Sequence, residues 1–259
     1  HLTYTQLDDA SARVAGWLAE LGVRPGGRVG IMLPNLVEFP IIYYGVLRAG
    51  AVVVPMNPLF KRREIEYYLT DSGASVLFAW EGLAAEAEAG SDAAGAALVL
   101  VDARFVAQLA DHEPPAAAVV DRAAGDTAVI LYTSGTTGSP KGAELTHANI
   151  ASNVAASVDL FSATDDDVIF GGLPLFHSFG QTCGLNSAVA VGARLTLIPR
   201  FEPTKALEVL QRDRVTILEA VPTMYMALLG HPEHDSYDTS SLRLSVSGGA
   251  SLPVEVLRG

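Results

Sequence analysis

Residues 132–142 of the chain are Tyr132-Thr133-Ser134-Gly135-Thr136-Thr137-Gly138-Ser139-Pro140-Lys141-Gly142. They follow the apolar run Ala128-Val129-Ile130-Leu131, which predicts a short buried strand, and they precede residues 145–150, which predict the start of a helix. Glycines in such a loop let backbone N–H groups approach phosphate oxygens, the Ser and Thr hydroxyls add donors, and Lys141 adds a positive charge. The order of strand, loop, lysine and helix therefore predicts a polyphosphate site.

This loop does not have the spacing of a Walker A motif, which requires G-x-x-x-x-G-K-[ST]. Pro140 stands five positions after Gly135, and Gly142 rather than Ser or Thr follows Lys141. The spacing disfavours a P-loop kinase. An ordinary flexible loop is the alternative interpretation, but eleven consecutive residues in this order after a buried strand favour phosphate binding.

The composition is that of a folded, acidic protein. The 259 residues are enough for one large or two ordinary domains, 49% of them are hydrophobic, and the formal net charge is −12. The negative charge argues against nucleic acid as a partner, because binding a phosphate backbone needs a basic face. No apolar run reaches the roughly 18 residues of a membrane span, and no secretory signal is visible, so the cytoplasm is the expected compartment. The single cysteine, Cys183, excludes an internal disulfide framework and a cysteine-based metal site.

Predicted helices and strands alternate along the first half of the chain. Helices are expected at 5–21, 35–48 and 61–72, and strands at 28–33, 51–54, 74–79 and 98–101. Thr5 with Asp8 is a variant of the capping box, and Gly73 is a stop signal for the third helix. The alternation predicts an α/β fold with a doubly wound, parallel sheet. A loop at 114–125 marks the expected boundary between a first lobe, residues 1–120, and a second lobe, residues 121–259.

In the second lobe, three segments carry polar residues or glycines next to predicted strands. Three consecutive acids at 165–167 favour a solvated turn over a divalent cation site. An octapeptide follows the predicted strand at 168–171, and its sequence is Leu173-Pro174-Leu175-Phe176-His177-Ser178-Phe179-Gly180. A glycine pair follows the predicted strand at 242–246 in the segment Ser247-Gly248-Gly249-Ala250-Ser251-Leu252-Pro253. Two glycines allow a flat base to lie on the backbone without obstruction by a Cβ atom.

The loop at 132–142, the octapeptide and the glycine pair together resemble the signatures of the adenylate-forming superfamily, which includes acyl-CoA synthetases, peptide-synthetase adenylation domains and beetle luciferases. The resemblance runs from Leu2 to the end of the chain and corresponds to the large N-terminal domain of an acyl-CoA synthetase or fatty-acid–CoA ligase. It implies two doubly wound, mainly parallel sheet lobes without the small C-terminal lid. Because the chain begins at His1 and ends within a predicted helix, we expect a fragment that binds nucleotide weakly and turns over poorly.

The resemblance also implies roles for individual residues. The β- and γ-phosphates of ATP would be held by Thr133, Ser134, Gly135, Thr136, Thr137 and Gly138. Lys141 would neutralise the leaving pyrophosphate, and His177 would be a gate at the entrance for the carboxylate and acyl groups. The pocket for the acyl group would be lined by Phe179, Cys183 and Ala250. The adenine would lie against Gly248, Gly249 and Ala250, and Arg200 would lie near the phosphates of CoA.

The family reaction that this resemblance implies has two steps. A carboxylate attacks the α-phosphorus of ATP in the presence of Mg²⁺, which gives acyl-AMP and pyrophosphate, and the thiol of CoA then displaces AMP. ATP, Mg²⁺ and CoA are therefore the implied cofactors, and the implied partner is a small-molecule carboxylic acid. The family glutamate that holds Mg²⁺ belongs after Gly259, so no metal ligand is expected in this chain.

Substrate preference follows from the residues around the octapeptide. No acidic residue near His177 is placed to pair with an ammonium group, so a simple carboxylic acid fits better than an amino acid. The surrounding Phe, Leu and Val residues favour a medium- or long-chain fatty acid, with an aryl or arylpropenoic acid second. Two other classes stay open: a luciferase-like oxygenase that uses the same adenylation step, and a nucleotide-binding module without chemistry.

Overall fold

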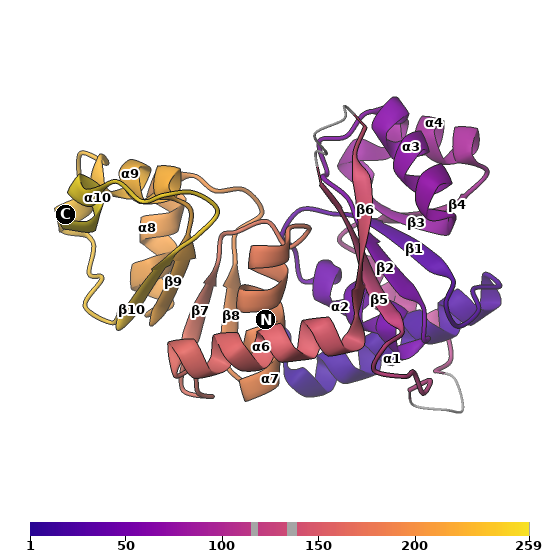
Figure 1. The fold of residues 1–259 in the computed structure, drawn as a ribbon, viewed down its shortest axis with the longest axis horizontal. Helices are drawn as coiled ribbons and strands as arrows, with labels where there is room; N and C mark the ends of the chain where they lie inside the picture. The colour runs from indigo at the N-terminus through magenta and orange to yellow at the C-terminus, as the bar shows by residue number, and fades with distance from the viewer. Residues whose placement is uncertain (115–118, 134–138, 259) are drawn as a thin grey trace. The chain divides into compact units, whose positions relative to one another are not determined.

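A computed structural model describes residues 1–114, 119–133 and 139–258 (Figure 1). The chain divides into two compact units, His1–Ile150 (unit 1) and Ala151–Gly259 (unit 2). This division falls later in the chain than the predicted one between residues 120 and 121. The reason is that the strands at Thr127–Thr133 and Lys141–Thr146 extend the first sheet instead of beginning the second.

The described part of unit 1 contains a six-stranded sheet with the order β4-β3-β1-β2-β5-β6. Its strands are β1 (Arg28–Met32), β2 (Val52–Pro55), β3 (Ala74–Trp80), β4 (Ala97–Val101), β5 (Thr127–Thr133) and β6 (Lys141–Thr146). All neighbours pair in parallel except β5 and β6, which pair antiparallel. The predicted parallel α/β arrangement of this unit is confirmed, with one antiparallel strand added at its edge.

The connections in unit 1 are mostly helical. They are α1 (Tyr4–Glu20), α2 (Glu38–Arg48), α3 (Arg62–Ser72), η1 (Glu81–Leu83), α4 (Ala84–Ala94), α5 (Phe105–Gln108) and η2 (Leu109–Asp111). The capping box of α1 is formed by Thr3 and Gln6, not by Thr5 and Asp8, because the helix begins earlier than expected. Gly73 ends α3 in the left-handed conformation at φ 68°, as predicted.

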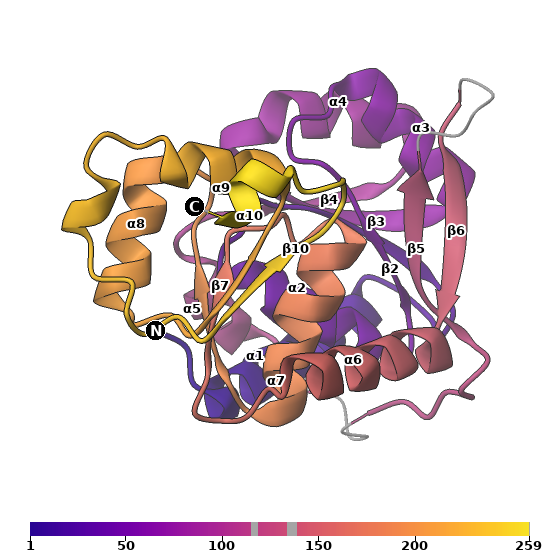
Figure 2. The same cartoon turned by 60° about the vertical axis from the view of Figure 1, so that its left-hand side comes forward.

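Strand β6 is a strand of unit 1 that the sequence did not predict. The expected order was strand, loop and helix, but β6 follows the loop and runs beside β5 before helix α6 begins (Figure 2). The first four residues of β6 are exposed, so the strand has no apolar alternation to reveal it. The antiparallel register places Lys141 opposite Thr133.

Unit 2 is built on a four-stranded parallel sheet with the order β10-β9-β7-β8 among the described residues. Its strands are β7 (Val168–Gly171), β8 (Arg194–Leu197), β9 (Ile217–Ala220) and β10 (Leu244–Ser247). Its other elements are α6 (His147–Phe161, from residue 151 on), the π-helix η3 (Gly180–Asn186), α7 (Ser187–Val191), α8 (Pro203–Arg212), α9 (Pro222–Leu229), η4 (His234–Ser236) and α10 (Val254–Arg258). The predicted second parallel sheet is confirmed.

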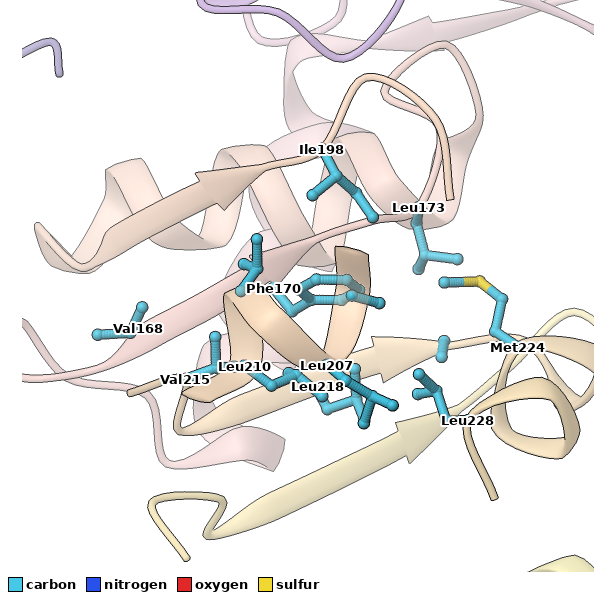
Figure 3. Close-up of a cluster of buried hydrophobic side chains, with 13 residues drawn as sticks. Val168, Phe170, Leu173, Ile198, Leu207, Leu210, Val215, Leu218, Met224 and Leu228 are labelled. Carbon is cyan, nitrogen blue, oxygen red and sulfur yellow. The ribbon is translucent and has the colours of Figure 1, made fainter. Parts of the chain in front are cut away.

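Apolar side chains pack on both faces of this sheet. On one face, α8 and α9 cover a cluster whose labelled members in Figure 3 include Phe170, Leu210 and Leu218. On the other face, the end of α6, η3 and α7 cover a smaller cluster around Ile169 and Ile217. Because both faces are buried, the strands read as short apolar runs, which is typical of parallel sheets.

An ion pair between a buried carboxylate, Asp167, and an exposed arginine, Arg243, lies at the amino edge of the unit 2 sheet. Asp167 accepts hydrogen bonds from Nε and Nη2 of Arg243 at 2.8 and 2.6 Å, and from Oγ1 of Thr216 at 2.6 Å. Arg243 also donates to the carbonyl oxygens of Phe161 and Ser162 at 3.0 and 3.1 Å. The prediction of a solvated acidic turn is therefore wrong for Asp167, which is 4% exposed, although its two acidic neighbours are exposed.

Across the described ranges, no helix is long and apolar enough to cross a membrane.

Replacement of Asp167 by Asn should destabilise unit 2 by about 2 kcal/mol, because it removes the charge-assisted hydrogen bonds between Asp167 and Arg243. Cys183 lies in unit 2, whereas both tryptophans, Trp17 and Trp80, lie in unit 1. Thiol labelling of Cys183 therefore reports the opening of unit 2, and tryptophan fluorescence reports unit 1. The matched control is Asp166→Asn at the exposed neighbour, which should change neither signal. Labelling at the wild-type rate in Asp167→Asn would contradict the assigned role.

The contribution of this ion pair should also depend on pH. The Arg243 guanidinium and the Thr216 hydroxyl hold the pKa of Asp167 well below its ordinary value. The stabilisation is therefore fully present above that ordinary value of about 3.9 and is lost as the pH falls toward the depressed pKa. Urea unfolding followed by circular dichroism should show a difference between wild type and Asp167→Asn that is constant from pH 7 to 5 and narrows below about pH 4.

Candidate functional site

The unit 2 sheet has a topological switch point, where the strand order reverses, at the carboxyl ends of its strands. The chain passes from β7 to β8 in one direction and then crosses back to β9 and β10, so the order reverses between β7 and β9. Ligands of open α/β sheets bind at the carboxyl ends of the strands at such a reversal. The octapeptide follows β7 and the glycine pair follows β10, so both predicted segments leave the sheet at this edge.

The octapeptide and the glycine pair contact each other. The Phe179 ring packs so closely on Gly248 that a Cβ atom at position 248 would lie 2.5 Å from Cε1 of the ring. The next residue, Gly249, is in the left-handed conformation at φ 79°, where an L side chain is strained. Ala250 follows and is exposed. The structure thus brings together two segments that the sequence analysis assigned to the acyl group and to adenine.

His177 lies in the turn between β7 and η3. Its backbone N–H donates to the carbonyl oxygen of Pro174 at 3.1 Å, and its carbonyl accepts from the N–H of Gln181 at 2.9 Å. Its ring packs against that of Phe176, with 4.6 Å between the centroids. The side chain is accessible, but desolvation by its neighbours lowers the pKa of His177, so the imidazole is neutral at pH 7 and offers both a donor and an acceptor.

Cys183 does not share a packing cluster with Phe179. It lies in the π-helix η3, where its sulfur is 3.4 Å from Oγ of Ser157 on α6, and it packs with the cluster on the α6 face of the sheet. Phe179 packs with the cluster on the opposite, α9 face. Burial raises the pKa of the Cys183 thiol, so it stays protonated at neutral pH. The assignment of both side chains to the acyl pocket stays a prediction.

Arg200, the predicted contact for CoA phosphates, lies in the turn between β8 and α8. Its side chain is exposed, and it makes no hydrogen bond or ion pair with another described residue. It is a free cation on this surface of unit 2, as far as the described residues show.

The predicted phosphate-binding residues belong to unit 1. Residues 134–138 lie outside the described part of the chain. Thr133 and Lys141, on either side of them, are both exposed and face each other across the last pair of the β5–β6 ladder. The hairpin thus holds a hydroxyl and an ammonium group next to the ends of the loop.

Glu219 is a buried carboxylic acid that the sequence analysis missed. It is 1% exposed, and its Oε1 has no hydrogen-bond partner among the described residues. Alternation along β9 turns its side chain toward the face covered by η3, where Oε2 lies 3.4 Å from the position of a Cβ atom on Gly184. Burial raises the pKa of Glu219 to about 8, so the neutral acid predominates at pH 7. An acid within the apolar run at 217–220 is the signal that could have revealed it.

The described ranges contain no cluster of metal-ligating side chains. No group of three or more His, Cys, Asp or Glu side chains there is placed to hold a metal ion.

Comparison with known proteins gives one family and many close relatives. Over 258 residues the chain is 38% identical to a feruloyl-CoA synthase of Amycolatopsis, covering 98% of this chain and 50% of that protein. It is 32% identical to a long-chain-fatty-acid–CoA ligase of Bacillus subtilis, covering 98% of this chain and 52% of that protein. Among solved structures, ATP-bound MatB from Rhodopseudomonas palustris superimposes with a TM-score of 0.89 at 33% identity, covering 99% of this chain and 51% of that chain.

The chain therefore spans about half the length of these relatives. The family description AMP-binding enzyme matches it without interruption, from residue 1 to residue 259. Together with the two parallel sheets and the paired octapeptide and glycine segments, this match shows that the chain belongs to the AMP-binding enzyme family.

Proposed function

We propose that this chain is the nucleotide- and acid-binding part of a carboxylic acid–CoA ligase. A carboxylate oxygen of the acid attacks the α-phosphorus of ATP and releases pyrophosphate, which gives acyl-AMP. The sulfur of CoA then attacks the acyl carbon, the thiol proton leaves, and AMP departs with the bonding electrons. The observation that carries this proposal is the contact between Phe179 and Gly248 at the carboxyl edge of the sheet, in a chain of the AMP-binding family. Both ATP and CoA make the cytoplasm the proposed compartment.

The residues of the chain would act mainly by binding and alignment, which phosphoryl and acyl transfers demand most. Thr133 and Lys141 would bind phosphate oxygens, and the positive charge of Lys141 would stabilise the leaving pyrophosphate. The neutral imidazole of His177 would donate a hydrogen bond to the carboxylate and orient it. The carboxylate would keep its negative charge and so remain a nucleophile. The backbone of Gly248 and Gly249 would lie against adenine, and Arg200 would bind a phosphate of CoA.

The first candidate substrate is a medium- or long-chain fatty acid. Its support is the apolar character of the residues around His177, together with the likeness to the Bacillus subtilis long-chain-fatty-acid–CoA ligase. An apolar acyl chain needs only apolar neighbours, and Phe179 supplies an aromatic one.

The second candidate substrate is a hydroxylated arylpropenoic acid. Its support is the likeness to a feruloyl-CoA synthase at 38% identity, and the buried carboxyl group of Glu219 with an unpaired oxygen. A buried polar atom without a partner is costly unless a ligand or water satisfies it. The helix η3, which covers Glu219, begins at Gly180, the last residue of the octapeptide. A phenolic hydroxyl bound beyond His177 would therefore be a suitable hydrogen-bond donor to the unpaired oxygen of Glu219.

Exchange of labelled pyrophosphate into ATP, dependent on added carboxylic acid, tests the proposed function directly. It should be measured on the 259-residue chain and, where the gene encodes a longer product, on that product. Exchange with one class of acid would support adenylation and identify the substrate class. ATP binding without exchange for any acid would favour a nucleotide-binding module, and light emission or oxygen uptake after adenylation would favour an oxygenase.

Replacement of Lys141 by Ala should lower the exchange rate about 100-fold, because a preorganised positive charge on the developing pyrophosphate is lost. Lys205→Ala is the matched control, since Lys205 is an exposed lysine whose ammonium group pairs, within the described part of the chain, with Glu208, three residues further along α8. Equal exchange rates in the two variants would remove Lys141 from the proposed phosphate site.

The substrate role of Glu219 can be tested with a matched pair of acids, ferulate and its O-methyl ether. If the phenolic hydroxyl binds Glu219, the wild type should prefer ferulate in kcat/KM, and Glu219→Leu should lower this preference about tenfold. Glu219→Gln keeps a hydrogen-bond acceptor and should retain most of it. The same ratio in the Leu variant, or a wild-type preference for fatty acids, would exclude the arylpropenoic candidate.

A further inference from the structure

We propose that Tyr67 and Tyr132 are positioning residues that hold the β5–β6 hairpin so that Lys141 stands opposite Thr133. This inference rests on the proposed function, in which both Thr133 and Lys141 bind the phosphates of ATP. Tyr67 lies outside the segments from which that function was inferred, and Tyr132 is the first residue of the glycine-rich stretch.

Helix α3 contacts β5 and the residue before β6, next to the two predicted phosphate ligands. The Tyr67 hydroxyl donates a hydrogen bond of 2.7 Å to the carbonyl oxygen of Pro140, the residue before Lys141. The Tyr132 hydroxyl, on the residue before Thr133, donates a hydrogen bond of 2.6 Å to Oδ2 of Asp71 on α3. Each predicted ligand therefore follows a residue that is tied directly to the same helix.

Aromatic packing supports these two hydrogen bonds. The rings of Tyr68 and Tyr132 lie 4.1 Å apart at 31°, and those of Tyr67 and Tyr132 lie 6.3 Å apart at 72°. All three rings pack against the apolar cluster between α3, α4 and the sheet. Strand β6 approaches the same rings, because a Cβ atom at Gly142 would lie 3.2 Å from Cζ of Tyr132.

The hydrogen bond to Pro140 falls where the sheet itself gives no support. Within the described residues, the β5–β6 ladder ends at the pair Thr133 and Lys141, so the Pro140 carbonyl lies beyond the last described pair. A lysine side chain is long and flexible, so its ammonium group is placed only as well as its backbone is placed. A displacement of about 1 Å in a positioned group can cost about 100-fold in rate.

The phenol of Tyr132 keeps its proton at neutral pH. Burial and the Asp71 carboxylate raise the pKa of Tyr132 well above its ordinary value. The hydroxyl of Tyr132 is therefore able to donate its hydrogen bond to Asp71.

The test compares Tyr67→Phe with Tyr68→Phe. Tyr68 lies in the same ring cluster, but its hydroxyl makes no hydrogen bond to another described residue, so Tyr68→Phe is a matched control. We expect Tyr67→Phe to raise the dissociation constant for ATP and the KM for ATP about fivefold, as loss of one hydrogen bond predicts. The KM for the carboxylic acid and the melting temperature should match those of Tyr68→Phe. ATP binding is measured by calorimetry and the KM values by pyrophosphate exchange.

A double variant tests whether Tyr67 acts through Lys141. If it does, Tyr67→Phe combined with Lys141→Ala should bind ATP no more weakly than Lys141→Ala alone. Additive losses, or identical ATP affinities in Tyr67→Phe and Tyr68→Phe, would overturn the positioning role. If the wild type binds ATP without exchange, the affinities still decide the inference while the proposed function fails. If the wild type binds no ATP, both fail.

Discussion

The buried carboxylate of Asp167 is the constraint on which the arrangement of unit 2 depends. Asp167 precedes β7, Thr216 precedes β9, and Arg243 precedes β10, so one hydrogen-bonded network joins the starts of three neighbouring strands. A buried charge needs several partners at once, which fixes these starts relative to one another. Each of the three strands is four residues long and parallel to its neighbours, so their carboxyl ends are fixed as well. The segments that carry the candidate site leave the sheet from those ends.

Unit 1 meets a similar requirement with phenolic hydroxyls and packed rings. Its hairpin extends the sheet by an exposed, antiparallel edge strand, β6. The pairing with β5 alone would leave this strand free to fray. Helix α3 restrains the hairpin through the hydroxyl of Tyr67, which binds the residue before β6, and through Asp71, which accepts from Tyr132 on β5. In both units, contacts outside the proposed ligand sites determine the positions of the residues that form those sites. Such contacts come from residues that are distant in sequence.

Much of the fold follows from local signals. The strand at 168–171, the stop at Gly73 and the alternation of helices with strands were all predictable, because each depends on residues that are adjacent in sequence. Strand β6 was missed because exposure removes its apolar alternation, and the unit boundary was misplaced with it. Asp167 was judged from its acidic neighbours, although its partner is Arg243. The site segments were recognisable from composition and order, but the contact of Phe179 with Gly248, the π-helix and the unpaired acid Glu219 arise only from tertiary packing.

The close approach of Phe179 to Gly248 has a consequence for how sequences of this kind can diverge. Any side chain at position 248 would occupy space that the phenyl ring already fills, so a larger residue there requires a smaller one at position 179. Conversely, loss of the ring opens a space that only a substitution after β10 can refill. The two positions are therefore expected to covary among homologues, and the evolutionary history of one segment is readable from the residues accepted in the other.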